Sequence, residues 1–179
     1  PYVMTHIFLE EDIETASIFG SIIFLDAGNI ASVSPIIGQE TFTLKLRSPI
    51  VENPDSIIDF SGHSLMIFSI EHNVQIGETL KGSKIKFCSL ELMEDRRMKL
   101  SQSFEGTYDK IVEKIFRDVL KSKKKLWLEE TFGPKKIIAP NVSPFDVIRL
   151  AMRQSVNKGK EPTYYFWETT KGYHFRTLE

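Results

Sequence analysis

Hydrophobic and polar residues follow a short, partly alternating pattern over the first hundred positions. Five runs are rich in β-branched and aromatic residues, and turn-forming stretches such as AGN, NPD and GETLKG separate them. Short strands at this spacing are typical of a small antiparallel barrel or sandwich. The five runs are residues 2–10, 17–26, 41–48, 63–70 and 83–92.

The pattern changes to a helical period after about residue 105. Apolar residues recur at steps of three and four from Tyr108 to Leu120, with charged residues between them, which predicts one amphipathic helix. Gly106 and Thr107 are candidate positions for its N-terminal cap, and the run KSKKK places cations at its C-terminal end, where they complement the helix dipole. This lysine run is therefore interpreted as a solvated helix end.

A second helix is predicted over residues 143–156. Ser143 is suited to cap it, Pro144 fits the first helical position, and Asp146 favours the positive first turn. Two short strand candidates, residues 126–132 and 135–140, precede this helix on either side of a Gly-Pro turn.

An aromatic hairpin is predicted at the end of the chain, with residues 162–168 and 173–179 joined across TTKG. Alternate residues of a strand point to opposite faces. One set, with Tyr165 and Trp167 as the candidate, packs against the helix that carries Ile148 and Met152, although the pattern does not decide which set faces inward.

These elements predict an α+β fold with two domains. Residues 1–100 form a small antiparallel β-barrel, and residues 101–179 form an α+β domain of a helix, two strands, a helix and a two-stranded hairpin. The numbering begins at Pro1, without Met, inside a strand-like run, so we expect a piece of a longer chain.

Composition narrows the range of functions. The formal net charge is −1, so no global field draws the protein to DNA or to an anionic membrane. No apolar stretch is long enough for a membrane anchor, and the start lacks the layout of a signal peptide. The single Cys88 excludes an internal disulfide within these residues and indicates assembly in a reducing compartment.

Residues for catalysis, cofactors or metals form no motif. Glycine-rich phosphate loops and a GxSxG nucleophile turn are absent from the sequence, and the four histidines lack ligand spacing. Cys88 is interpreted as a small buried hydrophobe, and the acidic pairs Glu10–Glu11 and Glu129–Glu130 as solvated groups. We therefore expect no enzyme activity, no cofactor and no metal site.

Three segments, in this order and spacing, resemble the baseplate hub proteins of contractile-tailed bacteriophages, which are related to the spike-forming hub of type VI secretion systems. The first is SIFGSIIFLDAGNIASVSPIIGQETFTLKLRSP. The second is RRMKLSQSFEGTYDKIVEKIFRDVL followed by KLWLEET. The third is the helix SPFDVIRLAMRQSV followed by YYFWETTKGYHFRTLE.

The resemblance implies a structural virion component in the tail baseplate, assembled in the host cytoplasm. Such a hub is a homotrimer with two similar barrels per chain, and it adapts a sixfold tail tube to a threefold spike. It has the tail tube protein and the spike protein as partners, and DNA passes through its channel without specific binding. Residues 1–100 resemble the first barrel, and the second barrel is not visible in this sequence.

The apolar turn SPIIGQE is the candidate subunit interface, with Pro35, Ile36, Ile37 and Gln39 as its residues; a loop tucked under its own barrel is the alternative. Other functions stay open. An oligonucleotide- or saccharide-binding module would use the barrel and the aromatic ribbon, and a tail-associated peptidoglycan hydrolase is the third possibility.

Overall fold

The computed structural model of the chain describes residues 3–25, 40–47, 57–76, 80–157, 159 and 163–178. The chain divides into two compact units, one made of residues 1–10 and 18–90 and the other of residues 11–17 and 91–179. Each unit is described by itself. The first is an antiparallel half-barrel and the second mixes helices with short strands, so the predicted α+β fold class is confirmed.

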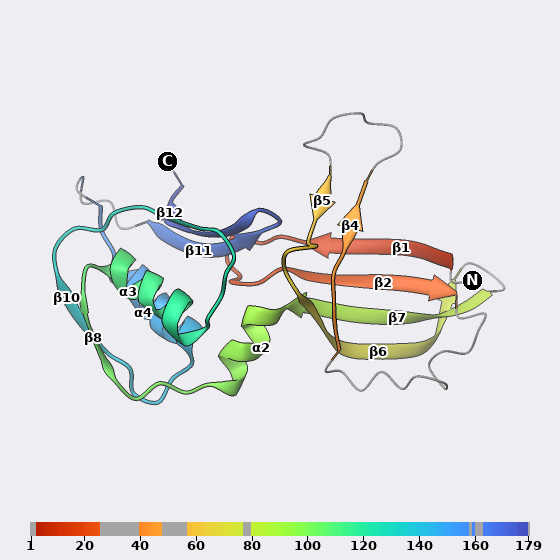
Figure 1. Ribbon diagram of the computed structural model, residues 1–179, viewed down its shortest axis with the longest axis horizontal. Coiled ribbons are helices and arrows are strands. Elements are labelled where there is room, and N and C mark those ends of the chain that lie inside the picture. Colours follow the sequence, from red (N-terminus) through yellow and green to blue (C-terminus); the bar gives the residue numbers. More distant parts are fainter. Residues whose placement is uncertain are drawn as a thin grey trace. The chain divides into compact units, whose positions relative to one another are not determined.

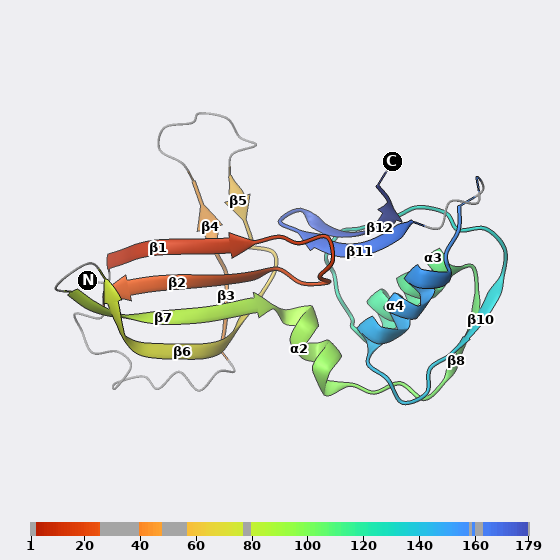
Figure 2. The same ribbon diagram turned by 180° about the vertical axis from the view of Figure 1, so that it is seen from behind.

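The first unit is built on a five-stranded antiparallel sheet with the strand order β1-β2-β7-β6-β3 (Figures 1 and 2). A separate two-stranded ribbon joins β4 to β5. The strands of this unit are β1 (Val3–Glu10), β2 (Phe19–Leu25), β3 (Thr41–Phe42), β4 (Lys45–Leu46), β5 (Ile58–Asp59), β6 (Leu65–Ile76) and β7 (Leu80–Ser89).

One face of this sheet packs on a small apolar core whose fully buried members include Phe60, Leu65 and Phe87. Gly20 in β2 is required by this packing. A Cβ atom at this position would lie 2.3 Å from the ring of Phe87 and 2.7 Å from the carbonyl oxygen of Phe8, so no larger residue fits without movement.

The last predicted strand of the first unit ends earlier than expected. The pattern of residues 83–92 predicts one continuous strand, but β7 ends at Ser89 and helix α2 (Leu90–Arg97) follows at once. The helix buries the carboxylates of Glu91 and Asp95, which lie one turn apart on the same face. The sequence of α2 is polar and has no apolar stripe, so the pattern of hydrophobic residues does not predict a helix there.

The second unit packs two helical segments on one face of a three-stranded sheet ordered β11-β12-β9 (Figure 1). The predicted first helix is confirmed as α3 (Tyr108–Lys114), which continues as the π-helical segment η2 (Ile115–Val119). Thr107 is its N-cap residue by position, although its side chain makes no capping hydrogen bond. The remaining elements are β8 (Ser103–Gly106), β9 (Leu126–Leu128), β10 (Lys135–Ile138), α4 (Pro144–Gln154), β11 (Tyr164–Thr169) and β12 (Gly172–Thr177).

The second predicted helix begins as its sequence indicated. The Ser143 hydroxyl accepts a hydrogen bond from the amide of Asp146 at 3.3 Å, and Pro144 is the first helical residue of α4. The same hydroxyl donates to the Asp146 carboxylate at 3.0 Å. Both contacts are local, so four consecutive residues are enough to define the start of this helix.

The two strand candidates around the Gly-Pro turn are present, but each has a distant partner. β9 runs parallel to β12, with Trp127 opposite His174, while β10 pairs with β8 in the antiparallel direction. Strand β8 was not predicted. The strands β9 and β10, which are neighbours in the chain, therefore belong to two different sheets.

The aromatic hairpin is confirmed, but the inward face is the opposite of the candidate set. Tyr164 and Phe166 are buried against the helices, whereas Tyr165 and Trp167 are half-buried on the outer face. The inner ring of Phe166 packs edge-on against Phe145 of α4 at 5.8 Å between centroids. Glu168 lies on the same face as Tyr164 and Phe166. Its carboxylate is paired with the buried ammonium of Lys124, so this face can be buried despite its charge.

Residues 11–17 belong to the second unit although they lie between two strands of the first. The Glu11 carboxylate accepts a hydrogen bond from the amide of Thr170 in the hairpin turn. Ala16 packs on the core of the second unit. The second unit therefore contains a segment from the beginning of the chain.

Candidate functional site

A buried charge cluster lies in the second unit, with Lys124 at its centre. The Lys124 ammonium is 2.6 Å from a carboxylate oxygen of Glu168 and 2.7 Å from one of Glu91. Lys124 is 3% exposed and Glu168 is 1% exposed, so these groups are withdrawn from water. The Ser122 hydroxyl donates to the other oxygen of Glu91 at 2.6 Å. The cluster thus joins α2, the loop before β9, and β11.

The chain before Lys124 is shaped to point this lysine inward. The Leu120 amide donates a hydrogen bond to the carbonyl oxygen of Ile115, which closes the wide π-helical turn. Lys121 then takes a left-handed conformation with φ of 54°. The Arg117 guanidinium donates to the carbonyl oxygens of Ser122 and Lys124, both at 2.7 Å. The interpretation of the lysine run as a solvated helix end is therefore wrong for Lys124.

The cluster keeps the lysine protonated. Burial by itself would lower the pKa of Lys124, but the charges of Glu168 and Glu91 outweigh burial and raise the pKa above its ordinary value. A charged ammonium between two carboxylates cannot act as a nucleophile or a base at neutral pH. The arrangement is suited to holding three elements together.

A second buried carboxylate of α2 binds the start of α4. Asp95 accepts a hydrogen bond from the amide of Phe145 at 2.5 Å, in the positive first turn of that helix. Burial raises the pKa of Asp95, while the hydrogen bond from the Phe145 amide acts in the opposite direction. Both buried carboxylates of α2 therefore have partners in the second unit.

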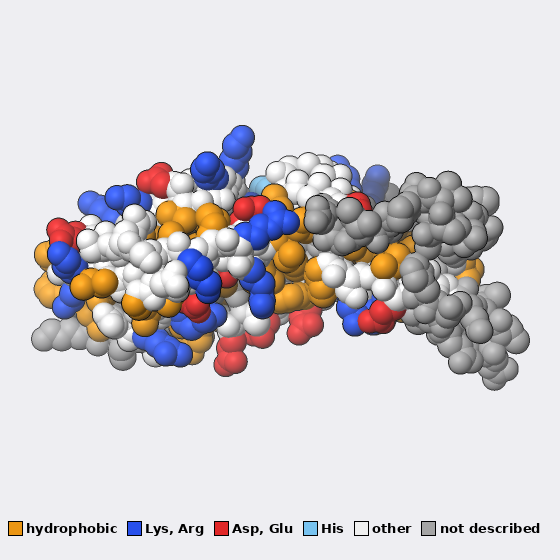
Figure 3. Space-filling view, turned by 90° about the horizontal axis from the view of Figure 1, so that it is seen from below, with side chains coloured by type: hydrophobic (Ala, Val, Ile, Leu, Met, Phe, Trp, Pro, Cys, Tyr) orange, Lys and Arg blue, Asp and Glu red, His pale blue; other side chains and the backbone are white. Residues whose placement is uncertain are grey.

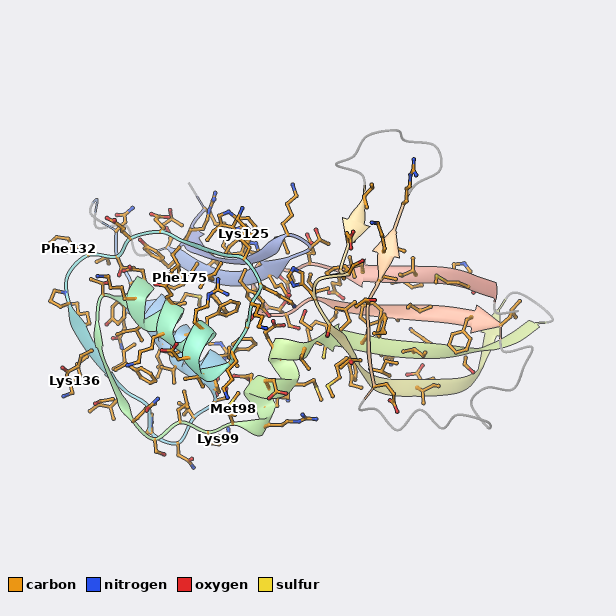
Figure 4. The ribbon with its side chains drawn as sticks, in the orientation of Figure 1. Met98, Lys99, Lys125, Phe132, Lys136 and Phe175 are labelled. Atoms are coloured by element: carbon orange, nitrogen blue, oxygen red, sulfur yellow. The ribbon has the colours of Figure 1, made fainter. Side chains whose placement is uncertain are left out.

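An aromatic row lies on the outer face of the three-stranded sheet. His174 of β12 stands between Trp127 of β9 and Trp167 of β11, with ring centroids 4.4 Å and 4.8 Å away and nearly parallel planes. The ammonium of Lys125 lies 4.4 Å above the Trp127 ring. We call these four side chains the aromatic row. Figure 4 shows Lys125 on the side of the sheet away from the helices and Phe175 on the helix side.

Basic side chains are interspersed with other side chains on one face of the molecule. Figure 3 shows lysine and arginine spread over the described part of one face of the molecule, with hydrophobic side chains between them. Several of these cations pair with acids, as in the 2.6 Å contact between Lys136 and Glu105.

The first unit exposes large apolar side chains along its edge strand. Among the described strands, β1 pairs only with β2, so its other edge has no strand partner there. Met4 is 52% exposed and Phe8 is 56% exposed on this strand. Phe8 and Phe68, which is also exposed, line an open hollow of about 360 Å³ that also contacts Lys84 and Lys86. Exposed edges with apolar side chains are typical of surfaces that join other chains.

The predicted interface residues Pro35, Ile36, Ile37 and Gln39 lie outside the described residues. Cys88 is buried, as expected. Within the described ranges, no group of three or more histidine, cysteine or acidic side chains has the arrangement of a metal site. No described helix is both long and apolar enough to cross a membrane.

Comparison with solved structures gives a likeness of fold. No family model matches the chain, and no match was found among curated proteins. Among solved structures, the fold is similar to the 43 kDa tail protein of prophage MuSo2 from Shewanella oneidensis, with a TM-score of 0.58 and 12% identity. The likeness covers 97% of this chain and 50% of that protein. It therefore shows the fold, and the chain spans about half the length of the tail protein.

Proposed function

We propose that this protein is a structural component of a bacteriophage tail, and that its place there is the central hub of the baseplate. The observation that carries the proposal is the likeness to the MuSo2 tail protein over almost the whole chain, through both units. The sequence resemblance to baseplate hub proteins points to the same kind of particle from separate features, the three sequence segments and their order.

The edge of β1 that has no partner among the described strands supports an assembly role. A long edge strand with exposed Met4 and Phe8 is a hazard for a protein that stays alone, because open edges recruit other strands. A closed ring of identical chains covers such edges without continuing into a fibre. The proposed assembly is a homotrimer that binds the tail tube protein on one side and the spike protein on the other.

Sedimentation velocity over a range of concentrations tests this proposal. We expect a concentration-dependent trimer that Phe8→Glu weakens, since a charge at the edge opposes close packing of a neighbour. Phe132→Glu is the matched control, because Phe132 is 57% exposed, as Phe8 is at 56%, but lies in the second unit. Circular dichroism establishes that both variants are folded.

A chain that stays monomeric at every concentration would contradict the hub assignment. An equal loss of trimer in the Phe8→Glu and Phe132→Glu variants would also contradict the assignment. Electron microscopy of the assembled chain then distinguishes a closed ring from an open stack.

A further inference from the structure

The outer face of the three-stranded sheet in the second unit carries more aromatic side chains than the fold requires. The sheet already buries four aromatic rings on its helix side, among them Phe166 and Phe175. The outer face adds Tyr165 and the three rings of the aromatic row, and these four rings are half-buried rather than covered. Tyrosine and tryptophan together with arginine form the composition that dominates binding hot spots.

The face is also cationic. Lys125 and Arg176 are exposed there, Arg176 lies opposite Tyr165 across the two strands of the hairpin, and Lys171 is exposed in the hairpin turn. Among the described residues these three cations have no ion pair with an acid. Carboxylates also lie near these cations. Glu11 accepts a hydrogen bond from the Thr170 amide, Glu129 accepts from the amide and hydroxyl of Thr177, and Glu14 lines a hollow together with Tyr165.

The stacking geometry decides what this face offers to a ligand. Each indole of the row turns one ring face to His174, and the Lys125 ammonium lies over the Trp127 ring. Because the rings stack across neighbouring strands, their planes stand on the sheet and their edges point outward. Ring edges carry partial positive charge, whereas ring faces carry partial negative charge. The outer face therefore presents positive ring edges beside the Lys125 and Arg176 side chains, which have no ion pair among the described residues.

This arrangement selects among ligand classes. A nucleic-acid base or a sugar ring would need an open aromatic face to stack on, and the faces in the row are largely in use. A polypeptide with carboxylate groups needs positive charge and apolar contact, and the face supplies both. The row is held rigid by its own stacking, so binding costs little side-chain entropy.

We propose that this face, made of Tyr165, Arg176 and the aromatic row, is a docking surface for an acidic segment of a partner protein. The proposal goes beyond the tail role and does not depend on it, because it concerns only the second unit. The partner segment is expected to carry aspartate or glutamate interleaved with apolar residues. Its carboxylates contact Lys125 and Arg176, and its apolar groups cover the exposed ring edges.

The two tryptophans of the chain are both in the aromatic row, so the protein carries its own probes. The experiment is a titration of the full chain with a short acetylated peptide that alternates Glu and Leu, followed by the two indole N–H signals in ¹⁵N–¹H NMR spectra and by tryptophan fluorescence. Comparison ligands are the same peptide with Lys in place of Glu, an oligothymidylate and a chitin oligosaccharide.

We expect both indole signals to shift in a saturable way with the Glu-Leu peptide and to stay in place with the Lys-Leu peptide. The double variant Lys125→Glu, Arg176→Glu should weaken binding about tenfold or more, because it reverses two charges at the contact. The matched control Arg96→Glu, Lys99→Glu reverses the same two residue types at exposed positions of the second unit outside this sheet and should bind as the parent does.

Three results would overturn the proposal: no saturable shift with the acidic peptide, an equal loss of binding in the control variant, or tighter binding of the oligothymidylate or the oligosaccharide than of the peptide. The last result would instead assign the face to nucleic acid or to saccharide.

Discussion

Replacing Lys124 with methionine should strongly destabilise the second unit. The substitution keeps the length and the apolar stem of the side chain but removes the ammonium that lies 2.6 Å and 2.7 Å from the two carboxylates. Glu91 and Glu168 would then be buried without their cation. Breaking a buried ion pair by removing one partner costs about 3–5 kcal/mol, which is a large part of the roughly 5–15 kcal/mol that keeps a domain folded.

Urea unfolding followed by tryptophan fluorescence measures this loss, because both tryptophans lie in the second unit. For a denaturant slope of about 2 kcal/mol per M, the midpoint should fall by about 1.5–2.5 M. The matched control is Lys123→Met at the exposed neighbouring lysine, which has no ion pair among the described contacts. It should change stability by no more than about 0.5 kcal/mol.

Two further measurements separate charge from packing. If Lys124→Met is combined with Glu91→Gln and Glu168→Gln, no uncompensated charge is left, and most of the lost stability should return. The folded state raises the pKa of Lys124 above its ordinary 10.5, so the stabilisation is complete below pH 10.5 and is lost as the pH rises through the folded pKa. Equal midpoints for Lys124→Met and Lys123→Met would refute the assignment of a stabilising role to the cluster.

Other predictions concern positions with defined geometry. Gly20→Ala should destabilise the first unit by about 1–3 kcal/mol, since its new methyl group meets the ring of Phe87, and thermal unfolding by circular dichroism would detect it. Ser143→Ala should cost about 1 kcal/mol through loss of the helix cap, measured in the same urea titration; no change would contradict the capping role. Burial, with a smaller contribution from the charge of Arg176, lowers the pKa of His174, so stability should fall as the pH drops below about 6.5 toward the folded pKa. His174→Gln should flatten this dependence.

Local sequence signals predicted the elements whose determinants lie close together in the chain. Ser143, Pro144 and Asp146 define the start of α4 within four residues, and the structure has all three in the expected roles. The aromatic hairpin likewise follows from two strand patterns and a turn containing Gly172. Neither prediction required knowledge of the rest of the fold.

The sequence could not decide the inward face of the hairpin because both alternate sets are aromatic. Glu168 shares a face with Tyr164 and Phe166, and its charge made that set the less apolar one. Burial of this face becomes favourable only when Lys124 is opposite, more than forty residues away in the chain. A pairing of this range has no local signature.

A signal for the buried cluster was nevertheless present. Leu126 and Leu128 pack on the core, and stepping back by two from Leu126 places Lys124 on the same inward side. With Phe166 buried, the same period places Glu168 on the inward side as well. A lysine and a glutamate on the inner faces of two strands of one sheet indicate a buried pair. Glu91 gave no such sign, because its helix has no apolar stripe.

Residues 11–17 have a consequence for how this protein can be inherited. A single genetic crossover at the joint between Leu90 and Glu91 would transfer the second unit without the stretch that supplies Ala16 and Glu11 to it. The protein that received this unit would have core residues exposed where Ala16 packs, and its Thr170 amide would lack the hydrogen bond to Glu11. Exchange between related genes should therefore preserve both units together, as one heritable block.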